Sequence, residues 1–119
     1  MDRLHYAGTS IVTGTDIAHA LLDYAQALAE AGASATVAIP TVNRDGTRGR
    51  SEVLIGPASQ LISDAEQSPH DEIVDAELVA HLHAVAGRVR DERSPSPQTD
   101  TTRIALDADG AADDYLDGF

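Results

Sequence analysis

Three arginines, Arg44, Arg48 and Arg50, lie close together in an otherwise acidic chain. Guanidinium groups bind carboxylates and phosphates through paired hydrogen bonds, so this cluster could hold an anion or an acidic protein partner. The plainer alternative is a solvated hairpin whose charges discourage edge-to-edge pairing with other sheets. Both interpretations place the three arginines on the protein surface.

The last residues of the chain combine aromatic and acidic side chains. Tyr115 and Phe119 are two of only four aromatic residues, and they flank Leu116 among three aspartates. Acidic residues keep such an apolar motif soluble until it folds onto a partner. We therefore expect Tyr115, Leu116 and Phe119 to bind a partner, with a merely solubilising tail as the alternative.

Histidines and carboxylates between residues 70 and 83 could in principle bind a divalent metal ion. However, His81 and His83 are two positions apart on a predicted helix, so their side chains point in nearly opposite directions. Only Glu77 and His81 have the spacing of helical neighbours, and two ligands make a poor site. We expect no native metal site.

A second cluster of chemically capable residues comprises His5, Tyr6, His70 and Asp71. These residues could serve a small hydrolase or a ligand-binding protein if two or three of them converge in a concave site. The chain has no cysteine, no nucleophile elbow, no phosphate-binding loop and no dinucleotide fingerprint. We therefore expect no cofactor, and we treat catalysis as the alternative to a binding function.

The elements that must position these residues follow from hydrophobic spacing. Apolar residues at helical intervals predict a helix over about residues 14–31, with Thr13 and Asp16 as a capping box and Gly32 as its end. A second helix is expected from about residue 71 or 72 to residue 90. The stretch between residues 58 and 70 is expected to be a long loop.

Residues 35–55 predict a β-hairpin whose register can be derived. A type I turn with Gly46 in a bulge pairs Asn43 with Thr47 and places Val37 opposite Val53. One face of the hairpin then becomes apolar, which favours this register over a two-residue turn. Residues 4–6 and 10–12 form either one bent strand or a second small hairpin.

The chain has 119 residues and a formal charge of −12. Residues 1–93 are expected to form one small domain with a charge of −7. Residues 94–119 contain one arginine and six aspartates, a charge of −5, and are expected to be a disordered acidic tail. This composition argues against nucleic-acid binding, and no apolar run is long enough to cross a bilayer.

These elements predict an α+β fold, a two-layer sandwich in which two helices cover one face of a mainly antiparallel sheet of three or four strands. Arginine in place of all lysines indicates a GC-rich, bacterial origin, and we expect a cytoplasmic protein. We expect the protein to act as a non-enzymatic protein-protein interaction module. The partner, which could be another protein or the chain's own tail, and the oligomeric state are left open by the sequence.

Overall fold

The computed structural model describes residues 1–58 and 60–93. The acidic tail, with Tyr115, Leu116 and Phe119, lies outside the described residues. The described part contains two helices and one five-stranded antiparallel sheet in the order β4-β3-β2-β1-β5. The predicted α+β class is confirmed, whereas the predicted number of three or four strands is wrong.

The first two strands form a short hairpin, β1 (Asp2–Tyr6) and β2 (Thr9–Thr13). Ala7 and Gly8 make the turn, and both have positive φ angles of 52° and 81°. A two-residue turn with two positive φ angles matches the twist of antiparallel strands. Of the two arrangements expected for this region, the structure therefore has the hairpin.

The fifth strand is the element that the sequence did not predict. β5 (Ile62–Ala65) pairs with β1 on the side opposite to β2, in a stretch that was expected to be a loop. It has four residues, and its one large apolar side chain, Ile62, is 59% exposed. A short, exposed edge strand lacks the alternating apolar pattern by which strands are recognised.

Helix α1 (Thr15–Ala31) begins one residue later than predicted and without the predicted cap. Gly14 occupies the N-cap position, and the Thr13 hydroxyl instead donates a hydrogen bond to the carbonyl oxygen of Pro40 at 2.7 Å. The cap comes from a distant residue, because Glu72 accepts a hydrogen bond from the Thr15 amide at 2.6 Å. Gly32 ends the helix in the left-handed conformation, as predicted.

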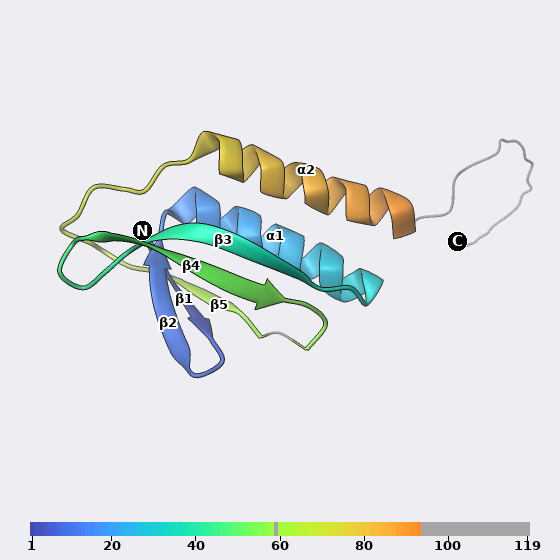
Figure 1. Cartoon of the computed structure of the whole chain (residues 1–119), viewed down its shortest axis with the longest axis horizontal. Coiled ribbons are helices and arrows are strands. Elements are labelled where there is room, and N and C mark those ends of the chain that lie inside the picture. Colours follow the sequence, from blue (N-terminus) through green and yellow to red (C-terminus); the bar gives the residue numbers. More distant parts are fainter. Residues whose placement is uncertain (59, 94–119) are drawn as a thin grey trace, which may run out of the picture.

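Strands β3 (Ala35–Val42) and β4 (Arg48–Ile55) form the long hairpin with the predicted register. Asn43 donates its amide to the carbonyl of Thr47 at 2.8 Å, and Val37 lies opposite Val53. β3 meets β2 only where Val12 pairs with Val42. The β1–β2 hairpin therefore diverges from the β3–β4 hairpin, as Figure 1 shows.

Helix α2 (Ala76–Arg93) packs along α1 (Figure 1). It starts about four residues later than predicted, because Asp75 caps it by accepting a hydrogen bond from the Leu78 amide at 3.0 Å. The preceding residues stay extended and bury Ile73. The core collects fully buried side chains from both helices and the sheet: Leu4, Ile17, Leu21, Ile39, Ile55 and Leu82.

Candidate functional site

The turn that carries Arg44 is held by a compact set of hydrogen bonds. Asp45 accepts hydrogen bonds from the amide and the hydroxyl of Thr47, at 3.0 and 2.7 Å. The bond from the Thr47 hydroxyl is the main reason why the pKa of Asp45 lies below its usual value. Gly46 has a φ of 91°, the left-handed conformation that the bulge requires. Arg44 is therefore presented on a defined turn.

The outer face of β4 carries the other two arginines. Residues 48, 50, 52 and 54 alternate with the buried positions of this strand, and all four are exposed. Arg48 donates a hydrogen bond to the backbone carbonyl of Asp71 at 3.3 Å. Arg50 lies opposite Pro40 of β3. We call Arg44, Arg48 and Arg50 together the arginine hairpin.

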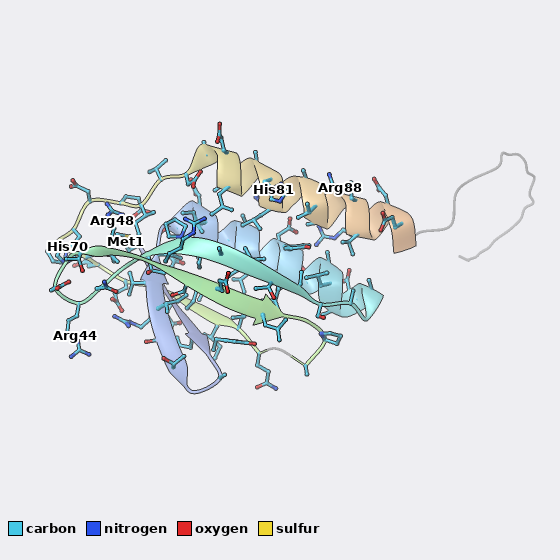
Figure 2. The ribbon with its side chains drawn as sticks, in the orientation of Figure 1. Met1, Arg44, Arg48, His70, His81 and Arg88 are labelled. Carbon is cyan, nitrogen blue, oxygen red and sulfur yellow. The ribbon has the colours of Figure 1, made fainter. Side chains whose placement is uncertain are left out.

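The Arg44 and Arg48 side chains point in different directions. Figure 2 shows Arg44 extending from the turn away from the body of the protein, while Arg48 lies beside the loop that carries His70. Within residues 1–58 and 60–93, neither the Arg44 nor the Arg50 side chain makes a hydrogen bond or an ion pair. Both guanidinium groups therefore keep their full hydrogen-bonding capacity for an external ligand.

Two other arginines of the domain, unlike Arg44 and Arg50, have carboxylate partners. Arg3 forms a bidentate ion pair with Glu66, with N–O distances of 2.6 and 2.8 Å. Arg90 of α2 contacts the Asp23 carboxylate of α1 at 2.8 Å. These pairs connect elements that are far apart in the sequence, so the two arginines have structural roles.

A polar groove of about 920 Å³ lies between the turn of the arginine hairpin and the β1–β2 hairpin. Arg3 and His5 of β1, Arg44 of the turn, and Glu66 and His70 of the following loop all line it. The groove was not predicted, because it depends on how far β2 diverges from β3. No local sequence pattern predicts the angle between β2 and β3.

The four residues proposed for catalysis do not come together. His5 and His70 line the polar groove, and His5 also contacts the Asp64 carboxylate at 3.1 Å. Tyr6, the next residue on β1, points to the opposite face and donates its hydroxyl hydrogen to the Leu54 carbonyl. The Asp71 side chain is exposed and does not line the groove. His5 and His70 therefore share the polar groove, His5 and Tyr6 share a second hollow, and neither site holds more than two of the four.

The residues considered for metal binding are spread over the molecule. His70 lies beside Gly46, Glu72 caps α1, and His83 contacts Asp23 at 2.8 Å. His81 is exposed on α2, away from the turn (Figure 2). In the part of the chain that the structure describes, no group of three or more potential ligands could hold a metal ion.

A buried carboxylate at the start of the chain was missed by the sequence analysis. Asp2 accepts hydrogen bonds from the hydroxyls of Thr15 and Ser63, at 2.7 and 2.8 Å, and lies 3.6 Å from His19. Burial raises the pKa of Asp2, but the two hydroxyls, His19 and the Met1 amino group together lower it by more, so it ends below its usual value. Because these partners are tens of residues apart, no local signal could have identified the cluster.

The fold and the arginine hairpin together define a class, an α+β protein with an antiparallel sheet and a cationic hairpin on an acidic surface. No family model, no curated protein and no solved structure matches the chain. Among the described residues, neither helix is long and apolar enough to cross a membrane.

Proposed function

We propose that this protein is a non-enzymatic protein-protein interaction module of the cytoplasm. In this proposal the domain is a two-layer sandwich with both helices on one face of the sheet. The arginine hairpin binds an acidic segment of a partner, and Tyr115, Leu116 and Phe119 supply a second, apolar contact. The partner is a protein, and nucleic acid and membrane are not ligands.

The observation that carries the proposal is the unpaired state of Arg44 and Arg50 within the described residues. An exposed guanidinium that already has a carboxylate neighbour offers little to a partner. A free one can form two parallel hydrogen bonds to a carboxylate. The turn that holds Arg44 is ordered by its own hydrogen bonds, which reduces the entropy lost on binding.

The test is co-purification with the full chain as bait, using two matched charge reversals. Replacement of both Arg44 and Arg50 by Glu removes the proposed contact. Replacement of Arg88, an exposed arginine on α2 far from the turn (Figure 2), makes the same kind of change elsewhere. We expect a protein that is retained by the wild-type chain and by Arg88→Glu but is lost from the double variant.

Loss of the same protein from a variant with alanine at Tyr115, Leu116 and Phe119 would support the second contact. Retention by every variant would contradict a role for the arginine hairpin. Absence of any enriched protein from the wild-type chain would contradict the interaction function itself.

The polar groove favours one alternative, a protein that binds a small ligand, because His5 and His70 both line it. Histidine ring signals in nuclear magnetic resonance spectra report on such binding directly. Titration with inorganic phosphate or acetate should shift the signals of both histidines saturably if the groove holds an anion. Unchanged signals would remove this alternative.

A further inference from the structure

Strand β4 is an edge strand, and among the described residues no strand pairs with its outer side. Near the end of β4 the Leu54 carbonyl on this side accepts a hydrogen bond from the Tyr6 hydroxyl. Because Asn43 and Thr47 form a hydrogen-bonded pair, the odd-numbered residues of β4 bond to β3. The amides and carbonyls of Arg48, Arg50 and Glu52 therefore point away from β3. Within the described residues, β4 pairs with β3 alone.

A mostly apolar hollow of about 170 Å³ adjoins this edge. Leu4, Tyr6 and Ile11 of the β1–β2 hairpin line it together with Val53 and Leu61. Tyr6, Ile11 and Leu61 are only partly buried there. The β1–β2 hairpin therefore presents apolar surface beside β4, where one further strand could cover it.

One stretch of the chain outside the structure has the pattern of such a strand. In residues 102–107, Thr102, Ile104 and Leu106 alternate with Arg103, Ala105 and Asp107. Such alternation, with two charged residues and one alanine on the second face, is typical of a strand with one buried face. The stretch contains neither proline nor glycine, whereas the residues before it include Pro95 and Pro97.

We propose that residues 102–107 add to the edge of β4 as an antiparallel sixth strand of the same chain. Charge selects the register: Arg103 lies opposite Glu52, and Asp107 lies opposite Arg48. A shift of two residues in one direction would place Arg103 opposite Arg50, a repulsive pair. A shift of two in the other direction keeps one attractive pair, Asp107 opposite Arg50, instead of two. In the favoured register Ile104 lies opposite Ser51, on the face that adjoins the hollow.

The chain can reach this position in the required direction. Figure 1 shows that α2 and β4 both run toward the right-hand side of the view, where α2 ends beyond the arrowhead of β4. Nine residues separate Arg93 from Arg103, and an extended segment of that length spans about 30 Å. A segment that arrives at the Ile55 end and continues toward Arg48 is antiparallel to β4.

This strand addition goes beyond the partner function proposed above, because it uses Ile104 rather than the aromatic residues at the chain end. The two proposals share Arg48, which lies opposite Asp107 in the added strand. It would protect an edge strand that otherwise invites pairing between molecules. Arg44, on the turn, stays free for a partner.

Hydrogen exchange of individual amides in the full chain tests the proposal. The amides of Arg50 and Glu52 should exchange at least about tenfold more slowly than unprotected amides, because each would donate to the added strand. Ile104→Asp places a charge in the hollow and should abolish this protection. Ala105→Asp makes the same substitution on the outer face, beside Arg50, and should preserve it.

Two further measurements sharpen the result. The Ser51 amide bonds to β3 and should remain protected in every variant, which shows that the domain is folded. Glu52→Arg should reduce the protection of the Arg50 amide, and Arg103→Glu added to it should restore that protection.

Unprotected Arg50 and Glu52 amides in the wild-type chain, or equal behaviour of the Ile104→Asp and Ala105→Asp variants, would overturn the proposal. Protection that disappears on dilution would assign the strand to a second copy and would also overturn it.

Discussion

At the scale of single residues, Gly14 is where two segments distant in the sequence come into close contact. A Cβ atom at this position would lie 1.9 Å from the carbonyl oxygen of Ile73 and 3.3 Å from the Glu72 carboxylate. Contacts this short cannot be accommodated by a side-chain rotation, because the Ile73 atom belongs to the backbone. The close approach is what allows Glu72 to cap α1 in place of a local residue.

We predict that Gly14→Ala lowers the free energy of unfolding by about 2 to 4 kcal/mol, because the segment around Ile73 must move. Gly87→Ala is the matched control, since a Cβ atom there meets nothing within 4 Å. In the interior of α2 this change should raise the free energy of unfolding by about 0.5 to 1 kcal/mol. Urea denaturation measures both, and equal effects of the two changes would be inconsistent with the structure.

At the scale of elements, one carboxylate joins the two helices. Asp23 of α1 contacts Arg90 at 2.8 Å and His83 at 2.8 Å, both on α2. The hydrogen bond from Arg90 is the main reason why the pKa of Asp23 lies below its usual value. A carboxyl group with a lowered folded pKa stabilises the protein fully above its unfolded pKa of about 4. That contribution is lost as the pH falls through the folded pKa.

Asp23→Asn should therefore lower the free energy of unfolding by about 1 kcal/mol at pH 7. The difference from the wild-type protein should shrink as the pH falls from 5 to 3, because the wild-type carboxylate becomes protonated there. Asp91→Asn, an exposed change on α2 without a partner in the described residues, is the control. A difference that is the same at pH 7 and pH 3 would show that Asp23 does not act through its charge.

Some elements are predicted correctly from the sequence and others are not. The difference is whether the residues that determine an element lie within it or far away in the sequence. The β3–β4 hairpin and its register follow from residues 35–55 alone, because Gly46 and the alternating apolar positions lie within the hairpin. β5 escapes prediction because its partner is β1, some 60 residues earlier, and its own pattern is weak. The caps of α1 and α2 were misplaced because Glu72 and Ile73 serve a distant helix end.

The same distinction applies to the candidate site. Arg44, Arg48 and Arg50 could be grouped from the sequence because one hairpin carries all three. The sequence does not show which arginines are paired. Arg3 has a partner because Glu66, on a distant segment, lies beside it, whereas no described carboxylate pairs with Arg44. The polar groove, likewise, depends on the fact that Val12 and Val42 are the one pair of residues matched in register between β2 and β3.

At the scale of the whole molecule, carboxylates connect segments that are distant in the sequence. Asp2 links β1 to α1 and β5, and Glu66 links the loop after β5 back to Arg3. Glu72 contacts both the Met1 ammonium group at 2.7 Å and the start of α1. The pKa of each of these three carboxyl groups lies below its usual value. The hydrogen bond from Arg3 is the main cause for Glu66, and the Met1 ammonium group is the main cause for Glu72.

Because these folded pKa values are lowered, the stabilisation is complete above pH 5 and declines as the pH falls below about 4. Acidification also removes the self-repulsion of a chain with a charge of −12, which acts in the opposite direction. We predict that the lost contacts dominate, so the free energy of unfolding should fall between pH 5 and pH 3. Urea denaturation across this range measures it. A constant or rising stability would mean that the relief of repulsion is the larger effect.

The central claim is that the arginine hairpin binds an acidic protein partner. The most direct test is the dissociation constant of the full chain for the protein that it retains, measured for two charge-reversed variants. Arg44→Glu combined with Arg50→Glu should weaken binding by about tenfold or more, whereas Arg88→Glu should change it by less than about twofold. Equal dissociation constants for the two variants would contradict the claim.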